Sequence, residues 1–265
     1  MAIFLIVILV LAVLAMSGRT GHPGLEAFKG WNYAHRGLYN AQRPENSLAA
    51  FQAALEHGYG VELDVHLLRD GNLAVMHDSD LSRMTGRPGR LEDLTTQQLS
   101  DYHLLDSDQT IPEFRRVLEL FAGKAPLIIE LKVSGNNFAS LCETACKMME
   151  GYPGPWCMES FDPRCVLWLR RHRPDIVRGQ LTENYFRSNV AVPAPLKWIM
   201  RHQLANFITR PDFVAYRFRD RKTVSDWIVR KFWHIQGVTW TVQTPQEHQT
   251  ALKEGWIPIF EHFEP

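Results

Sequence analysis

The chain has 265 residues, 45% of them hydrophobic and 22% charged, which is enough for one sizeable hydrophobic core. Its formal net charge at pH 7 is zero, and we expect no nucleic-acid partner. The four cysteines lack the C-x-x-C spacing and the accompanying histidines of a zinc site. We therefore expect free thiols in a reducing compartment at Cys142, Cys146, Cys157 and Cys165.

The N-terminal stretch is apolar. Residues 2–16 carry no charge, and the uncharged stretch continues to Gly18. Eighteen helical residues would measure about 27 Å, close to the roughly 30 Å of a bilayer's hydrocarbon core. We expect a single-pass transmembrane helix at 1–18 that anchors the chain, and a linker at 19–30. A cleaved signal peptide is the alternative, but no Lys or Arg precedes the apolar stretch.

Positive charge is distributed unevenly along the chain. Arg19 and Lys29 follow the apolar stretch, which favours a cytoplasmic position for the rest of the chain. Residues 163–231 contain 15 Lys and Arg but only 5 Asp and Glu. This excess indicates a nearby anionic surface, such as lipid head groups or phosphate.

The elements that follow alternate between strands and helices. Residues 31–34 predict a strand that delivers His35 and Arg36 at its end, and Ser47 is a suitable N-cap for a helix that Gly58 ends. Residues 60–67 predict the second strand. Asp70-Gly71 separates that strand from the apolar residues 73–76, a pattern that predicts an extra antiparallel hairpin.

Further strands recur along the chain with helices between them. Residues 81–110 are polar and predict loops with short helical turns, and a helix is expected after Ile111-Pro112-Glu113. Strands are predicted at 126–133, 156–161, 177–181, 213–217, 237–242 and 256–260, with helices that include 164–172 and 222–233. Eight parallel strands in this order predict an α/β fold, a (β/α)8 TIM barrel formed by residues 31–265. The connection at 182–212 is long enough to shape a binding site.

Two acidic residues stand out in the second strand. Glu62 and Asp64 are two positions apart, so they share one face of the strand. Two buried carboxylates repel each other unless a positive charge lies between them. Glu130 ends another strand and reaches the same C-terminal face of a barrel. Three carboxylates favour a hard divalent cation, Mg²⁺ or Ca²⁺, over zinc.

An ordered set of motifs surrounds these carboxylates. His35-Arg36-Gly37 is followed by Pro44-Glu45-Asn46-Ser47, by Glu62-x-Asp64, by Asp70-Gly71-x5-His77-Asp78 and by the L-x-R-x-T-G pattern of residues 81–86. Matches continue at residues 128–132 and 240–242. This set resembles the glycerophosphodiester phosphodiesterase family over most of residues 31–260. The last residues, 259–265, depart from the Thr-Asp-x-Pro pattern of that family, which puts substrate contacts there in doubt.

The resemblance implies a role for each matching residue. It implies that Glu62, Asp64 and Glu130 bind the metal, that His35 and His77 form an acid–base pair, and that Arg36 and Lys132 hold phosphate oxygens. Glu45 is expected to be an additional metal ligand or a group that supports the ligands. Trp240 resembles an aromatic residue of the substrate wall, and packing within the barrel is the alternative for it.

The expected function is metal-dependent hydrolysis of a glycerophosphodiester to glycerol 3-phosphate and an alcohol. Lysophospholipase-D-like hydrolysis of membrane lysophospholipids is the alternative that the apolar N-terminus and the basic region favour. A membrane-tethered binding protein on an inactive barrel is an alternative of another class. Retention of both histidines, the three carboxylates, Arg36 and Lys132 argues against the inactive barrel.

Overall fold

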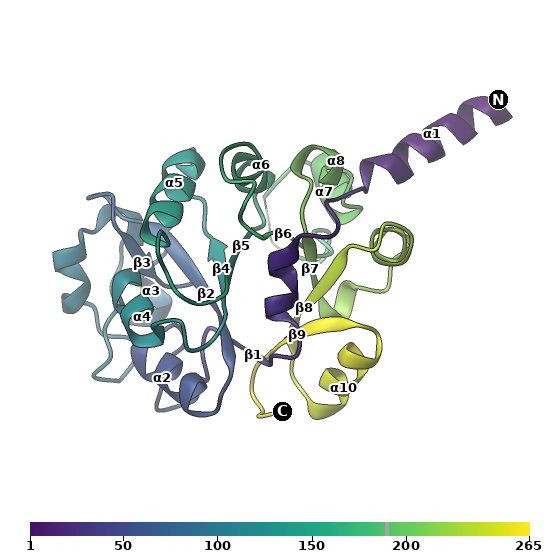
Figure 1. The fold of residues 1–265 in the computed structure, drawn as a ribbon. Helices are drawn as coiled ribbons and strands as arrows, with labels where there is room; N and C mark the ends of the chain where they lie inside the picture. Colours follow the sequence, from purple (N-terminus) through teal and green to yellow (C-terminus); the bar gives the residue numbers. More distant parts are fainter. Residues whose placement is uncertain (189–190) are drawn as a thin grey trace.

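A parallel barrel forms the body of the protein. The computed structural model describes residues 1–188 and 191–265 (Figure 1). Its strands pair in sequence order, and β1 closes the barrel by pairing with both β2 and β9. The predicted (β/α)8 barrel is therefore confirmed. The eight parallel strands are β1 (Tyr33–His35), β2 (Gly60–Leu67), β4 (Leu127–Leu131), β5 (Trp156–Ser160), β6 (Arg178–Thr182), β7 (Phe213–Arg217), β8 (Gln236–Val242) and β9 (Trp256–Phe260).

The predicted hairpin is also present. Strand β3 (Leu73–Val75) pairs antiparallel with β2, with Val75 opposite Val65. Gly71 supplies the left-handed backbone of the turn, at φ 84°. The hairpin carries the chain from the end of β2 back to the level of Asp64, whose carbonyl oxygen accepts a hydrogen bond from the Met76 backbone N–H, so that the residues after β3 return to the C-terminal face of the barrel.

Helices cover the outside of the barrel. The Ser47 hydroxyl accepts a hydrogen bond from the Ala50 backbone N–H and caps α2, as the sequence predicts. The predicted polar stretch at 81–110 contains short turns: α3 (Ser82–Thr85), η2 (Leu91–Asp93) and η3 (Thr96–Asp101). The other covering elements are α2 (Leu48–Glu56), α4 (Phe114–Phe121), α5 (Phe138–Met148), α6 (Pro163–His172), η4 (Phe218–Asp220), α9 (Val224–Trp227), η5 (Ile228–Phe232) and α10 (Pro245–Lys253).

Two apolar layers stabilise the barrel. The outer layer lies between strands and helices and includes Phe51 and Phe114. The inner layer fills the N-terminal end of the barrel, where Phe213 lies against β6. A Cβ atom at Gly179 would lie 2.2 Å from the Phe213 ring, so this position has no room for a larger residue. Because side chains fill that end, space for ligands remains at the C-terminal end. The four cysteines are buried and free, as predicted.

The N-terminal segment differs from the expectation. Helix α1 covers only Ala2–Ala15, 14 residues, or about 21 Å at 1.5 Å per residue. The transmembrane helix expected at 1–18 is therefore not found, because the chain leaves the helix at Met16 and Ser17, which are buried against the barrel. Among the described residues, none of the helices is both long and apolar enough to cross a membrane.

The expected linker at 19–30 packs on the barrel. It contains the short helix η1 (Pro23–Phe28), which lies over the strands near β8 and β9 (Figure 1), and its Phe28 belongs to the inner apolar layer. Phe28 is buried there, and its carbonyl oxygen accepts a hydrogen bond of 2.9 Å from the Tyr33 hydroxyl. The segment therefore closes the end of the barrel opposite to the C-terminal ends of the strands.

The long connection between β6 and β7 lies at the barrel rim. It contains α7 (Ala194–Arg201) and α8 (Asn206–Thr209), and its residues 189 and 190 lie outside the described residues. Leu196 and Met200 of α7 line a cavity of about 1020 Å³. The expectation that this connection shapes a binding site thus agrees with its position.

Candidate active site

Three carboxylates meet at the C-terminal end of the barrel. Glu62 and Asp64 extend from β2, and Glu130 lies beside Asp64 in the register of β2 and β4. One oxygen from each lies within 4.8 Å of the others, and all three residues are buried. Oxygen ligands of Mg²⁺ and Ca²⁺ lie about 2.0–2.6 Å from the ion, so the cluster fits either cation. The structure brings together the three residues predicted as metal ligands.

Positive side chains partly balance this cluster. Lys132 Nζ lies 3.0 Å from Asp64 Oδ1 and 2.7 Å from Glu130 Oε1. Although burial favours the neutral acid, the charges of Lys132, His77 and Arg36 hold the pKa of Asp64 well below its usual range. Burial raises the pKa of Glu62 and of Glu130 above its ordinary value. The cluster is therefore short of positive charge.

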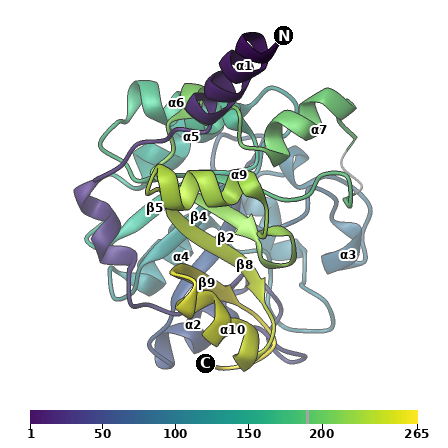
Figure 2. The same ribbon diagram turned by 90° about the vertical axis from the view of Figure 1, so that its right-hand side faces the viewer.

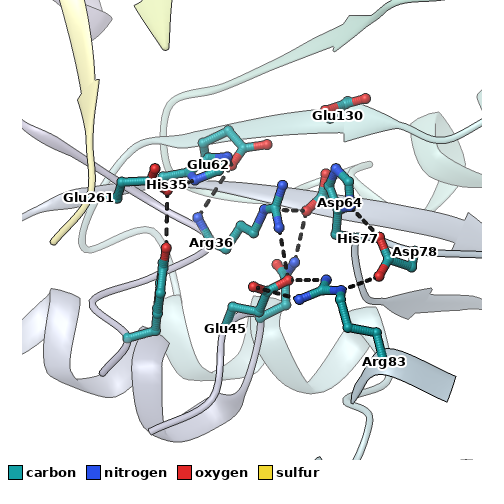
Figure 3. Close-up of polar contacts among 12 residues, drawn as sticks. His35, Arg36, Glu45, Glu62, Asp64, His77, Asp78, Arg83, Glu130 and Glu261 are labelled. Carbon is teal, nitrogen blue, oxygen red and sulfur yellow. Dashed lines mark hydrogen bonds and ion pairs between the residues drawn. The ribbon is translucent and has the colours of Figure 1, made fainter. Parts of the chain in front are cut away.

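His35 is oriented by an acidic residue at the far end of the chain. Its Nδ1 atom lies 2.6 Å from Glu261 Oε2, and its Nε2 atom lies 3.8 Å from Glu62 Oε2 (Figure 3). Because an ionised carboxylate only accepts, Nδ1 carries the proton of this hydrogen bond. Burial lowers the pKa of His35, and the hydrogen bond to Glu261 opposes that effect. The Nε2 atom of His35 therefore faces the carboxylate cluster.

Sequence reasoning did not single out Glu261. Besides His35, its carboxylate accepts hydrogen bonds from Tyr39 at 3.0 Å, Thr241 at 2.8 Å and Gln243 at 2.7 Å. Burial disfavours ionisation, but the bond to His35 and these donors hold its pKa far below its usual range. Glu261 directly follows β9, so its place at the end of the last strand was the signal that could have identified it.

A chain of ion pairs orients His77. His77 Nδ1 lies 2.6 Å from Asp78 Oδ1, and Arg83 contacts both Asp78 and Glu45 (Figure 3). Arg36 Nη1 donates to the same Glu45 carboxylate at 2.8 Å. Glu45 thus forms ion pairs with two guanidinium groups, and it lies outside the three-carboxylate cluster. This geometry agrees with a supporting position for Glu45 more than with that of a metal ligand.

The backbone around the PEN motif also positions the cluster. Arg36 and Asn46 both adopt a left-handed backbone at φ 56°, a conformation that Asn tolerates well. The Asn46 side chain donates to Asp64 Oδ2 at 2.8 Å, and its backbone N–H donates to the Arg36 carbonyl at 2.8 Å. Asn46 therefore orients a predicted ligand, although its role was not recognised from the sequence.

The cluster opens into a cavity of about 1020 Å³. His35, Arg36 and His77 line it together with Glu62 and Glu130 of the cluster, and its apolar lining includes Phe161, Leu181 on β6, and Leu196 and Met200 on α7. Trp240 borders the cavity, with its ring 5.5 Å from Phe161 in an edge-on contact, and its Nε1 atom donates to the Ala215 carbonyl. Trp240 both packs within the barrel and forms part of the wall, and its contact with substrate stays a prediction.

A fourth carboxyl group lies beside the cluster. Glu159 on β5 pairs in register with Glu130 and is 1% exposed. Within the described residues its Oε2 atom has no hydrogen-bond partner. Burial raises its pKa well above the ordinary value. A strand is predicted here from the sequence, but Glu159 was not among the predicted site residues.

Comparison with known proteins agrees with this geometry. The model of the glycerophosphoryl diester phosphodiesterase family matches residues 35–263. The chain belongs to this family. A family member of Caldanaerobacter subterraneus, named glycerophosphodiester phosphodiesterase, is 35% identical over 150 residues, which are 52% of this chain and 57% of that protein. Glycerophosphodiester phosphodiesterase 1 of Bos taurus is 28% identical over 84% of this chain and 76% of its own length.

Solved structures of family members have the same fold. A phosphodiesterase of Oleispira antarctica, solved in complex with the product sn-glycerol-3-phosphate, superposes with a TM-score of 0.70 at 21% identity and covers 92% of this chain and 95% of its own. The glycerophosphodiester phosphodiesterase of Thermotoga maritima superposes with a TM-score of 0.66 at 23% identity, and the match covers 87% of this chain and 94% of its own. The chain aligns with about half the length of several sequence relatives, 46% for the Bacillus altitudinis protein and 57% for that of Caldanaerobacter.

Proposed function

We propose that the protein is a phosphodiesterase that uses a divalent cation to hydrolyse glycerophosphodiesters to glycerol 3-phosphate and an alcohol. The observation that carries the proposal is the buried cluster of Glu62, Asp64 and Glu130 between two histidines that are each oriented by a carboxylate. The product named for the Oleispira antarctica structure, sn-glycerol-3-phosphate, supports the substrate class.

The two histidines have complementary positions. Carboxylates occupy Nδ1 of both rings, so each Nε2 atom remains for proton transfer. We assign His35 as the base that removes the proton of the nucleophile, because its Nε2 lies on the side of the cluster and burial favours its neutral form. His77, held by Asp78, then protonates the leaving oxygen.

The cationic side chains would bind the phosphoryl group. Arg36 and Lys132 both line the cavity beside the cluster, and both are ion-paired with it. Mg²⁺ or Ca²⁺ held by Glu62, Asp64 and Glu130 would supply the charge that stabilises the phosphoryl oxygens in the transition state. With the cation in place, Lys132 would be released from two carboxylates and could turn toward phosphate.

Lysophospholipids are the second candidate substrates. The volume of about 1020 Å³ exceeds what a small diester needs, and the end away from the cluster includes Phe161, Leu181 and Leu196. An acyl chain would bury its surface against these side chains. A small diester would leave this end of the cavity without a ligand.

An activity panel tests both candidates. Protein freed of metal by a chelator is assayed on glycerophosphocholine and on lysophosphatidylcholine, with Mg²⁺ or Ca²⁺ added back. Release of glycerol 3-phosphate that requires a cation supports the first candidate, and cation-dependent release of lysophosphatidic acid supports the second. Absence of turnover on every diester, with the cation bound, would favour a non-catalytic binding protein.

The histidine roles are tested with substrates that differ in leaving-group pKa. His35→Ala and His77→Ala should each lower kcat by roughly 10²–10⁴-fold. The His77→Ala enzyme should recover much of its rate with a very good leaving group, since that group needs no proton. If both variants respond equally to the leaving-group pKa, the assignment of acid and base is wrong.

A further inference from the structure

Exposed apolar side chains gather on one side of the barrel. Of the eleven large apolar side chains that are exposed in the described structure beyond residue 15, nine lie between residues 186 and 232. They include Trp198 on α7, Phe207 on α8, Trp227 on α9 and Phe232 on η5. Figure 2, which faces this side, shows α1, α7 and α9 together, and α1 contacts α8. We call this surface the α7–η5 face.

The charge exposed on this part of the chain is positive. Residues 186–232 contain ten Lys and Arg and three Asp. The three acids do not offset the exposed bases, because Asp212 and Asp226 are buried and the Asp220 side chain is only 4% exposed. Asp212 and Asp220 pair with Arg19 and Arg187, respectively. By contrast, Lys222 and Lys231 are exposed beside the apolar side chains.

Helix α1 projects from the same side. From Ile3 to Leu11 every side chain is apolar and at least 48% exposed. Its base is fixed to the barrel, since Trp233 Nε1 donates to the Val13 carbonyl at 2.9 Å and Arg210 donates to Ser17 Oγ at 3.0 Å. The apolar helix therefore has a fixed exit point beside α8.

From these observations we infer that the α7–η5 face, together with α1, docks on an anionic lipid bilayer surface. Tryptophan and phenylalanine side chains beside lysines are the composition that enters the boundary between head groups and acyl chains. Clustered Lys and Arg attract anionic head groups, and no exposed acid in the segment opposes them. An acidic protein partner would match the charge but would not account for an apolar helix exposed on all sides.

The same face adjoins the cavity. Leu196 and Met200 of α7 line the cavity, and Leu196, Trp198 and Ile199 of the same helix are among the exposed side chains. A bilayer on this side would thus lie one helix away from the apolar end of the cavity. The inference concerns the location of binding and does not depend on which diester is hydrolysed.

Vesicle flotation with the purified full chain tests the inference. Vesicles of phosphatidylcholine alone are compared with vesicles that also contain phosphatidylglycerol, and flotation should be stronger with the anionic lipid and weaken as salt increases. Lys222→Glu/Lys231→Glu should lower the partition coefficient at least about tenfold. Its matched control is Arg115→Glu/Arg116→Glu on α4, on the opposite side in Figure 1, which changes the charge equally and should retain binding.

A second pair of variants tests the apolar contribution. Trp227→Ser/Phe232→Ser should weaken flotation several-fold, whereas Leu105→Ser/Leu252→Ser, also exposed, should not. Because α1 is intact in all four variants, these comparisons isolate the barrel surface, and circular dichroism melts check that each variant is folded. Equal flotation with both vesicle types, or equal losses in a variant and its control, would overturn the inference. The inference would also be overturned if the chain self-associates and Trp227→Ser/Phe232→Ser abolishes this self-association without affecting flotation. The α7–η5 face would then bind a second copy of the chain.

Discussion

Replacement of Glu261 by Gln tests whether the last strand takes part in catalysis. The change keeps the size of the side chain and removes its charge, so His35 Nδ1 loses an ionised acceptor at 2.6 Å. A hydrogen bond to a charged group contributes about 1.5–3 kcal/mol. If that contribution is realised when His35 becomes positively charged in the transition state, kcat/KM should fall roughly 10- to 150-fold.

The pH profile gives an independent check on the same variant. Burial lowers the pKa of His35, and the bond to Glu261 raises it. In Glu261→Gln the raising contribution is lost, so the pKa of His35 should fall further. Since the proposed base must be neutral, the acid limb of the kcat/KM profile should move to lower pH while the plateau falls.

Thr241→Val is the matched control for this experiment. It removes the hydrogen bond to Glu261 Oε1 and leaves the contact between Glu261 Oε2 and His35 in place. Its kcat/KM should stay within about threefold of the wild-type value, as expected for one neutral hydrogen bond at the edge of the site. A Glu261→Gln plateau within twofold of wild type, or an acid limb shifted to higher pH, would refute the reasoning.

Three further predictions concern the carboxylates and Lys132. In calorimetric titrations Glu62→Gln should weaken cation binding by at least about 100-fold, and Glu45→Gln should weaken it by less than about fivefold. In thermal melts, a cation at a concentration of about 100 Kd should raise the Tm of the wild type by roughly 5–10 °C. The same cation concentration should leave the Tm of Glu62→Gln unchanged. Lys132→Met should bind the cation about tenfold more tightly while losing turnover, because Nζ no longer competes for two ligands; weaker binding would contradict this. Since the pKa of Glu159 is raised in the folded protein, this residue ionises first in the unfolded chain, and its own contribution to stability falls as pH rises above about 4.3. In urea unfolding, Glu159→Gln should therefore be more stable than wild type at pH 8 by about 1–3 kcal/mol, with a smaller difference at pH 4.

The barrel could be predicted from the sequence because strands buried on both faces form continuous apolar runs. Each predicted strand overlaps an observed one, and the hairpin follows from Asp70-Gly71. The end of α1 could not be predicted in this way. Its side chains are uniformly apolar, and the helix ends where Met16 and Ser17 meet residues such as Asn206 and Arg210, about 190 positions away in the sequence.

The residues of the candidate site can likewise be separated into those that the local sequence predicts and those whose position depends on distant contacts. Glu62 was predicted as a ligand from its residue type and its spacing to Asp64, whereas the role predicted for His77 came from the motif that resembles the family. Glu159 and Glu261 lie in no quoted motif, and their importance depends on which strands become neighbours when the barrel closes. Asn46 lies inside a motif, but its bond to Asp64 depends on a left-handed turn that the sequence pattern alone does not specify.

The charges at the barrel mouth explain why these buried acids can coexist in a folded protein. Two acids outside the cluster are already balanced, since Glu45 is paired with two arginines and Glu261 with His35. Inside the cluster Lys132 bridges Asp64 and Glu130, while burial keeps the pKa of Glu62, and that of Glu159 beside the cluster, well above the ordinary value. The mouth thus holds carboxyl groups that cannot all ionise without further positive charge. A divalent cation held by Glu62, Asp64 and Glu130 would supply that charge, so the arrangement that weakens the metal-free fold would favour cation binding and, as proposed above, release Lys132 for phosphate.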